Sequence, residues 1–255
     1  MPLEIVTIPC LSDNYAFLIH EQLTGMTALV DAPEAAPIEA ELARRGWGLD
    51  FILLTHHHDD HIAAVDTLRA KHDTIVIGAA ADAHRLPALD LKVEHGSTFS
   101  LAREEVTVID TPGHTKGHIC FHIPTVKALF SADTLMAGGC GRLFEGTPQQ
   151  MFTSLSKLAA LPADTKVYSG HEYTLSNLNF ALSVEPKNKK LQARLKATEA
   201  ARAQGTPTVP STLADELATN PFLRSQSPEL RAMIGMENDS DAAVFAEVRR
   251  RKDTF

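Results

Sequence analysis

Residues 55–61 read Thr-His-His-His-Asp-Asp-His, which places four imidazoles and two carboxylates within seven residues. Neutral imidazole is a ligand for zinc, iron and similar ions, and carboxylates widen the choice of metal. The apolar run Phe51–Leu54 before the cluster predicts a buried strand, and the apolar positions within 62–68 predict the start of a helix. The cluster is therefore expected on a strand-to-helix loop, as part of a metal-binding site.

The spacing within this cluster indicates two neighbouring metal positions. His56 and His58 can point together from the loop, while Asp60 and His61 lie at the entry of the helix and aim at an adjacent point. Histidine-rich tracts also occur as tags or as solvated loops that bind metal fortuitously. This tract is internal and directly follows an apolar strand, which favours a built site.

Further candidate ligands follow later strands of the sequence. Apolar patterns predict strands at 105–110, 128–132 and 166–169, and these strands are followed by His114, Asp133 and His171. Proline and glycine in 111–118 mark a turn in which a histidine can face a metal. A carboxylate at position 133 could bridge two ions. Each of these residues is weak evidence alone, but together they complete a two-metal set.

The whole pattern resembles the metallo-β-lactamase superfamily, whose signature is a His-x-His-x-Asp-His loop followed by a His, an Asp and a His at later strand ends. That resemblance implies a first metal held by His56, His58 and His114, a second held by Asp60, His61 and His171, and a bridging Asp133. His57 and Asp59 occupy the variable positions of the loop, and His57 is expected not to bind metal.

Two further residues are expected to support the ligands. Asp31 ends the strand-like Ala28–Val30 and could orient a metal ligand through a hydrogen bond. His118 lies in the turn motif after His114, where an outer supporting or packing role is expected.

Two adjacent cations would make the site hydrolytic. Metal lowers the pKa of bound water from about 15.7 to roughly 7, and two ions about 3.5 to 4 Å apart can hold hydroxide and polarise a carbonyl. Asp60 and Asp133 would orient the bridging hydroxide. The sequence contains no Gly-x-Ser-x-Gly elbow that would suggest a serine nucleophile, and none of Cys10, Cys120 and Cys140 stands at a ligand position.

The composition is ordinary for a soluble globular protein. The 255 residues are 44% hydrophobic and 22% charged, and no run of about 18 apolar residues predicts a membrane span. The N-terminus lacks a basic region followed by a long apolar stretch, and the cysteine count is odd, so a cytoplasmic location is expected. A formal net charge of −8 argues against nucleic acid as a partner, and therefore against a nuclease.

The pattern of elements changes near residue 172. Short strands alternate with helices before this point, whereas 173–255 is predicted to be almost wholly helical. One helix is expected over His61–Lys71, and Ser211 is expected to be the N-cap of a helix over Leu213–Ala218. We therefore expect a catalytic domain at 1–172 and a helical substrate-binding domain at 173–255. The fold class implied by the resemblance is an α/β, four-layer αββα sandwich with a C-terminal helical domain.

Within that superfamily the chain resembles glyoxalase II, the hydroxyacylglutathione hydrolases, over essentially its whole length. The resemblance rests on Gly139–Gly146, His171–Thr174, Asn220–Arg224 and Val248–Phe255. It implies hydrolysis of S-(2-hydroxyacyl)glutathione thioesters, usually S-D-lactoylglutathione, to glutathione and D-lactate. The glutathione contacts that it implies are Arg142, Tyr173, Arg249 and Lys252.

Two positions depart from the commonest pattern of that family. Arg142 stands where a lysine is frequent, so the positive charge is kept but is carried by a planar guanidinium. Phe144 stands where a tyrosine is frequent, so a hydroxyl is lost. An altered affinity for glutathione is expected. The basic run Arg249–Lys252 also has a simpler interpretation, because cations at a helix C-terminus gain about 0.3 to 1 kcal/mol each from the macrodipole.

Three rival functions stay open at this level. A persulfide dioxygenase of the same superfamily would use a single iron, a metallo-nuclease would need a basic face, and a non-catalytic binding protein would be expected to lack some ligands. The ligand types do not identify the metal, so two divalent ions are expected, with zinc first and iron or manganese as alternatives. A monomer that binds a small glutathione thioester is expected.

Overall fold

The computed structural model describes residues 3–255, and they divide into two compact units. The first unit runs to Asp110 and resumes over Gly117–Phe130, and the second comprises Thr111–Lys116 and Ser131–Phe255. The domain boundary expected near residue 172 follows the change from strands to helices along the chain, and it stays a prediction.

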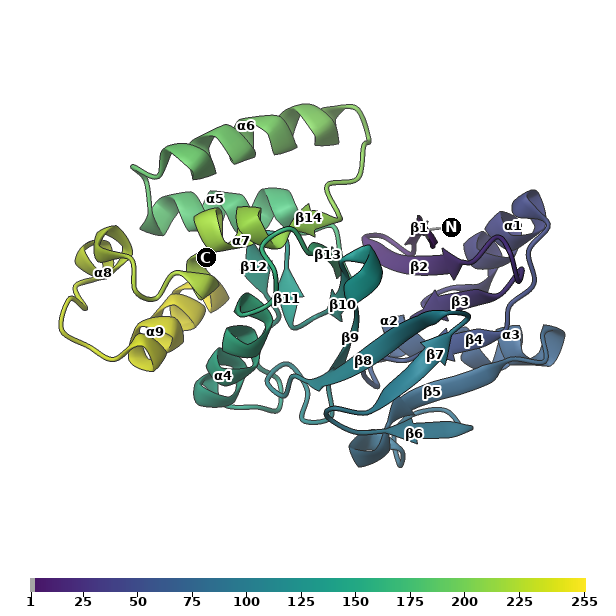
Figure 1. Cartoon of the computed structure of the whole chain (residues 1–255). Coiled ribbons are helices and arrows are strands. Elements are labelled where there is room, and N and C mark those ends of the chain that lie inside the picture. The colour runs from purple at the N-terminus through teal and green to yellow at the C-terminus, as the bar shows by residue number, and fades with distance from the viewer. Residues whose placement is uncertain (1–2) are drawn as a thin grey trace. The chain divides into compact units, whose positions relative to one another are not determined.

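The first unit contains two sheets. The first sheet has the order β1 (Glu4–Cys10), β2 (Asn14–His20), β3 (Thr27–Val30), β4 (Phe51–Leu53), β5 (Ile75–Ala79) and β6 (Leu91–Val93). The pairs β1–β2 and β2–β3 are antiparallel, and the pairs from β3 to β6 are parallel. Figure 1 draws these strands in purple to blue. The strands of the second sheet that lie in this unit have the order β7 (Thr98–Leu101), β8 (Glu104–Asp110), β9 (Ile119–Ile123) and the start of β10 (Ala128–Ala132).

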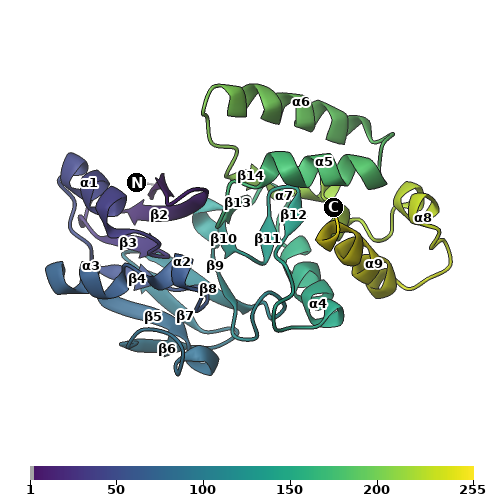
Figure 2. The same cartoon turned by 180° about the vertical axis from the view of Figure 1, so that it is seen from behind.

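Helices cover one face of the first sheet. These are α1 (Ala35–Arg45) and α3 (Val65–Lys71). The unit also contains the short helix α2 (Asp59–Ile62) and two 3-10 helices, η1 (Ala80–Asp82) and η2 (Pro124–Val126). Ile38 of α1 and Leu68 of α3 are fully buried and belong to one core cluster with Leu18 and Leu29 of the sheet. Figure 2 shows these helices on the near side of the strands.

Strand β2 is buried on both faces, which fixes its place between two layers. Ala16 and Leu18 point into the helix-covered cluster, whereas the ring of Phe17 lies 5.7 Å from that of Phe130 in β10. Because successive side chains of a strand alternate between faces, one face of β2 meets helices and the other meets the second sheet. Strand β2 therefore lies between the helices and the second sheet.

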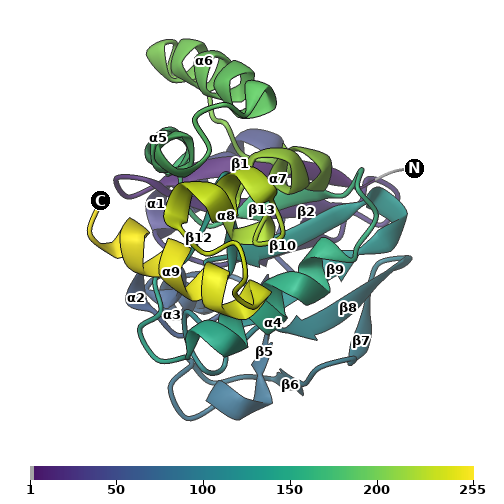
Figure 3. The same cartoon turned by 90° about the vertical axis from the view of Figure 1, so that its left-hand side faces the viewer.

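The second unit is largely helical. Its elements after β10 are β11 (Leu135–Met136), β12 (Gly139–Cys140), α4 (Pro148–Ala159), β13 (Lys166–Ser169), α5 (Thr174–Val184), α6 (Lys189–Ala203), β14 (Ser211–Thr212), α7 (Leu213–Thr219), η3 (Pro221–Leu223), α8 (Pro228–Ile234) and α9 (Asp241–Asp253). Figure 3 shows α4 beside α9, and the rings of Phe152 and Phe245 lie 6.0 Å apart. Thr147 caps α4 with a complete capping box.

Two local expectations were wrong. A single helix was expected from His61 to Lys71, but the amide of Ala64 donates to the carbonyl of Ala32 at 2.9 Å, which separates α2 from α3. Ser211 was expected to cap α7. Ser211 instead pairs in β14, and the side chain of Thr212 accepts from the amide of Asp215.

Among the helices of residues 3–255, none has both the length and the apolar character that a membrane span requires.

Within residues 3–255 the three cysteines are buried and form no disulfide, which makes their reactivity a test of the packing. Burial raises the pKa of the Cys140 thiol to about 11 and that of Cys10 to about 12. At pH 8 roughly 0.1% or less of either thiol would be thiolate, the nucleophilic form. We expect Ellman's reagent to react slowly with the native protein and with three thiols after unfolding in guanidinium. Rapid reaction of a native thiol would contradict the packing described.

Candidate functional site

The buried carboxylate of Asp31 organises the loop after β4. Its Oδ1 accepts the amide of Thr55 at 2.9 Å, and its Oδ2 accepts the Thr55 hydroxyl and the Nδ1–H of His61, both at 2.8 Å. All three residues are almost completely buried. Because a carboxylate accepts, the proton of His61 lies on Nδ1, and Nε2 carries the ring lone pair that a metal requires. Asp31 adopts φ 56°, a conformation that aspartate tolerates better than most residues.

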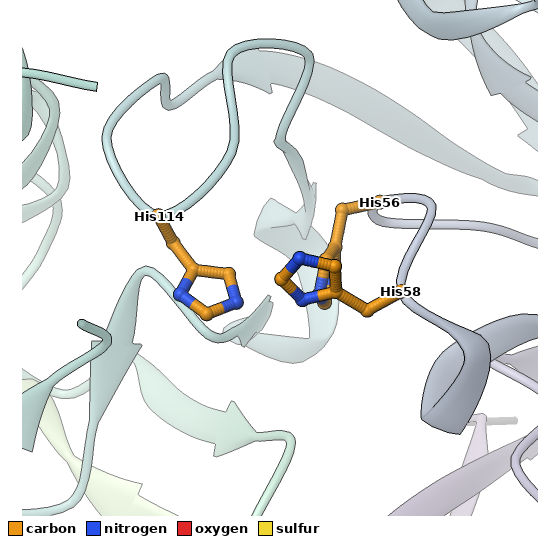
Figure 4. Close-up of side chains that lie close together, drawn as sticks. All are labelled: His56, His58 and His114. Atoms are coloured by element: carbon orange, nitrogen blue, oxygen red, sulfur yellow. The ribbon is translucent and has the colours of Figure 1, made fainter. Parts of the chain in front are cut away.

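The neighbouring histidines extend from the same loop. His56 Nε2 lies 3.1 Å from His58 Nδ1, and the ring of His118 stacks on that of His56 with centroids 4.8 Å apart. His118 is buried, so the structure places it in packing contact with a predicted ligand. His56 and His58 are drawn in Figure 4 on the loop from which they extend.

Asn14, which the sequence analysis did not select, holds Asp60. Its Nδ2 donates to the backbone carbonyl and to Oδ2 of Asp60, each at 3.0 Å. Asp60 Oδ2 then lies 3.7 Å from Nε2 of His61. The signal in the sequence was a polar residue opening the otherwise apolar stretch Tyr15–Ile19.

A second carboxylate that sequence reasoning missed is Asp82. His57 Nδ1 lies 3.1 Å from Asp82 Oδ2, which directs His57 to a partner other than the predicted ligands. Gly117 packs so tightly here that a Cβ on it would come 2.2 Å from the Asp82 carboxyl carbon. The available signal was a lone acid within the alanine-rich Ala79–Ala83.

The second unit places its three predicted ligands together. His114 Nε2 and His171 Nε2 lie 3.3 and 3.4 Å from Oδ2 of Asp133. His114 Nδ1 donates to the carbonyl of Arg142 at 2.7 Å, so here too the ring proton is on Nδ1 and Nε2 carries the lone pair. All three ligand residues are buried.

The backbone around Asp133 is closely constrained. The amide of Gly141 donates to the Asp133 carbonyl at 3.0 Å, and a Cβ on Gly141 would come 2.0 Å from that oxygen. Ala132 precedes Asp133 with φ 38°, an uncommon value for a residue with a side chain. Only glycine at 141 permits this approach, which fixes the carboxylate at the end of β10.

Histidine and aspartate side chains form three groups able to hold metal, with ligand atoms within 4.8 Å of one another. The groups are His56, His58 and His114 (Figure 4); His56, His61 and Asp133; and Asp60, His61 and His171. All seven predicted ligands occur in them. The donor set, imidazole nitrogens with carboxylate oxygens, suits zinc, iron or manganese.

Aromatic rings and a cation line the second unit near these ligands. The ring of Tyr173 stacks on His171 with centroids 4.7 Å apart and an interplanar angle of 5°. Phe144 is 62% exposed, and its ring lies 5.3 Å from that of His114. Arg142 is largely exposed, with Nε 3.6 Å from Asp253 Oδ1. An exposed ring and an exposed guanidinium at this position can meet a ligand.

The two cations predicted in the terminal helix occupy different environments. Arg249 is only 5% exposed, and its Nη1 donates to the Cys140 carbonyl while Nη2 donates to Asp253, both at 2.9 Å. Lys252 is half-buried, and its Nζ lies 3.3 Å from the Ser176 hydroxyl. Burial, and secondarily the charge of Arg249, lowers the pKa of Lys252. The direct glutathione contact of either residue stays a prediction.

Comparisons with known proteins cover the whole chain. Residues 15–171 match the family model described as "Metallo-beta-lactamase superfamily", and residues 172–255 match "Hydroxyacylglutathione hydrolase C-terminus". A Ruegeria pomeroyi protein named hydroxyacylglutathione hydrolase is 62% identical over 255 residues, which are 100% of both chains. This chain belongs to the hydroxyacylglutathione hydrolase family. As a family member it has the metallo-β-lactamase fold with a C-terminal helical region, which confirms the predicted fold class.

Solved structures with a similar fold also match this chain. ETHE1 from Myxococcus xanthus has a TM-score of 0.67 and 24% identity, covering 100% of this chain and 99% of that one. TTHA1623, solved in a di-iron-bound form, has a TM-score of 0.62 and 26% identity, covering 86% of this chain and 100% of that one. The first likeness concerns the fold alone.

Replacing Asp31 by asparagine tests how the first half of the site is held. Asparagine tolerates the same backbone conformation, so Asp31→Asn removes mainly the charge that orients His61. We expect zinc affinity, measured by competition with a chromophoric chelator, to fall about 10- to 100-fold.

Asp50→Asn is the matched control, since Asp50 also accepts a backbone amide in this unit, that of Thr27, but contacts no predicted ligand. Equal zinc affinities in the two variants would contradict the role given to Asp31.

Proposed function

We propose that this protein hydrolyses S-(2-hydroxyacyl)glutathione thioesters, with S-D-lactoylglutathione as the principal substrate. The observation that carries the proposal is the full-length relationship to proteins named hydroxyacylglutathione hydrolase, in a chain that retains all seven candidate ligands. The products would be glutathione and D-lactate, a step that removes methylglyoxal once it has been converted to the thioester.

We further propose two divalent ions per chain, zinc first and iron or manganese as alternatives. His56, His58 and His114 would hold one, Asp60, His61 and His171 the other, and Asp133 would lie between them. Ions bound there lower the pKa of water toward neutrality and polarise a carbonyl. The ring tautomers support this assignment, because Asp31 and the Arg142 carbonyl each keep the proton of one ligand histidine on Nδ1.

The chain's own groups would position the reactants. The carboxylates of Asp60 and Asp133 can accept hydrogen bonds from the attacking water and orient it toward the thioester carbon. Asn14 fixes the rotamer of Asp60, and Gly141 fixes the backbone of Asp133. Attack forms the carbon–oxygen bond, and collapse breaks the carbon–sulfur bond with thiolate as a good leaving group. No strong general acid is needed.

Glutathione would be bound by the second unit. Tyr173 presents an exposed ring beside His171, and Arg142 and Lys252 supply positive charge for the carboxylates of glutathione. The Nζ of Lys252 lies over the rings of Phe180 and Phe255, 5.4 and 5.3 Å from their centroids, which limits its freedom before a ligand arrives. Phe144 can pack against the peptide but offers no hydroxyl.

Three buried cysteines that form no disulfide among the described residues suit a reducing compartment, and on this ground we propose a cytoplasmic enzyme. We also propose that it acts as a monomer on its small substrate.

Metal content and hydrolysis test the proposal together. We expect purified protein to bind two divalent ions and to consume the thioester absorbance of S-D-lactoylglutathione. Asp133→Ala should abolish both the second ion and turnover, because two ligand histidines lie within 3.4 Å of that carboxylate.

Full activity with two ions in Asp133→Ala would refute the bridging assignment. One iron per chain, no hydrolysis and oxygen uptake with glutathione persulfide would instead indicate a dioxygenase.

Removing the charge of Lys252 tests the glutathione site. A charge-assisted contact contributes about 1.5 to 3 kcal/mol, so Lys252→Ala should raise KM about 10-fold or more. The value of kcat should change little, because the residue is not among the predicted metal ligands.

Lys190→Ala, which removes an exposed cation on α6 of the same unit, is the control and should leave KM unchanged. An unchanged KM in Lys252→Ala would favour a helix-end role for the basic run.

A further inference from the structure

The hairpin β11–β12 joins two parts of the candidate site. It begins just after Asp133 and ends just before Gly141 and Arg142, whose backbone groups bond Asp133 and His114. The carbonyl of Arg142 fixes the His114 ring, so a shift of the hairpin end would rotate or release that imidazole. The position of a predicted metal ligand therefore depends on where this hairpin lies.

Side chains from the helical region hold five consecutive residues of this hairpin by their backbone. Asn220 Nδ2 donates to the carbonyls of Met136 and Gly139, at 3.2 and 2.9 Å. Asn177 Nδ2 donates to the carbonyl of Ala137 at 3.1 Å. Glu216 accepts the amide of Gly138 at 2.8 Å. Arg249 donates to the carbonyl of Cys140 at 2.9 Å.

Glu216 lies at the centre of this arrangement. Its side chain is fully buried, and Oε2 accepts both the Gly138 amide and Asn220 Nδ2. Its Oε1 accepts Arg194 Nη2 at 2.6 Å, which compensates the buried charge. A buried carboxylate is costly unless it is paired and fully hydrogen-bonded, so this geometry strongly constrains the hairpin.

The hairpin residues are shaped to receive these groups. Gly138 has φ 69°, and a Cβ there would come 2.6 Å from Leu178. A Cβ on Gly139 would come 2.5 Å from the amide of Asn177. Close approach of helix side chains to the hairpin backbone is thus possible only with glycine at both positions.

We propose that Glu216, with Asn220, is a positioning residue of the metal site, acting through the β11–β12 hairpin on the Arg142 carbonyl and the His114 ring. The helical region then has a second role, in holding a metal ligand as well as glutathione. This inference rests on the proposed function, since it concerns the metal site of that reaction.

Glu216→Gln tests the inference against a matched control. Glu185 is also fully buried and paired with an arginine, accepting Arg224 Nε and Nη2 at 2.8 and 2.9 Å, but it contacts no hairpin residue. Both Glu216→Gln and Glu185→Gln should lower the thermal midpoint. Only Glu216→Gln should weaken zinc binding by the apo-protein, about 10-fold or more, and lower kcat per folded molecule with little change in KM.

Zinc affinity and kcat in Glu216→Gln that match those of Glu185→Gln would overturn the inference. The zinc titration needs no thioester, so a wild-type protein that binds zinc but does not hydrolyse S-D-lactoylglutathione would refute the proposed function while leaving this test intact. Should Glu216→Gln fail to fold, Asn177→Ala removes one hairpin contact. Its control is Asn179→Ala on the same helix, because the Nδ2 of Asn179 donates to the carbonyl of Leu175 within that helix at 2.9 Å.

Zinc affinity is measured in these two variants in the same way. Weaker zinc binding in Asn177→Ala than in Asn179→Ala supports the positioning role, and equal binding refutes it.

Discussion

The hydrogen bond from His61 Nδ1 to the buried carboxylate of Asp31 is the contact on which the first half of the site depends. A neutral imidazole binds metal only through the nitrogen that lacks a proton, so the partner of the other nitrogen decides what the ring can do. Asp31 also bonds the amide and hydroxyl of Thr55. One carboxylate at the end of β3 thereby fixes the backbone after β4 and the tautomer of a histidine beyond it.

In the second unit the tautomer of a ligand histidine is also fixed by a hydrogen bond, but the acceptor is different. His114 donates to the backbone carbonyl of Arg142 rather than to a carboxylate. A carboxylate acceptor belongs to a single side chain, whereas the position of a backbone carbonyl depends on the conformation of the surrounding backbone. This difference explains why residues 132–141 contain an uncommon backbone angle at Ala132 and a glycine whose Cβ would overlap Asp133, and why helix side chains bond that segment so densely.

The sequence predicted what depends on local pattern. The apolar run before Thr55 and the ligand spacing after it indicated a strand followed by a metal-binding loop, and the change to helices after residue 172 was also visible. Contacts between distant residues were not predictable in this way. Asn14 lies 46 positions from Asp60, and Glu216 lies 78 from Gly138. Asn and Glu occur so often in helices and turns for local reasons that neither spacing nor composition separates these two from others.

The helix break between His61 and Val65 also depends on a contact between distant residues that the local sequence does not predict. Both flanking segments favour helix, and nothing local opposes one continuous helix. The break arises because Ala32 and Ala64 share a hydrogen bond, and the carbonyl of His61 accepts from Ala32. The strand end that carries Asp31 thus requires the helix entry to stay close, and tertiary bonding overrides propensity.

The periodicity of the terminal helix α9 places its two predicted glutathione-binding cations in different environments. Val244, Phe245, Val248 and Arg249 are its buried residues, so Arg249 lies on the inner stripe, where its guanidinium also lies 5.0 Å from the ring centroid of Phe222. Lys252 is one turn later, at the edge of that stripe, half-buried against Phe180. Residues three apart on a helix are neighbours, so an anchored Arg249 holds Lys252 in a defined place. Under the proposed function Lys252 would meet glutathione while Arg249 bonds the Cys140 carbonyl, which would couple glutathione binding to the β11–β12 hairpin that carries the acceptor of His114.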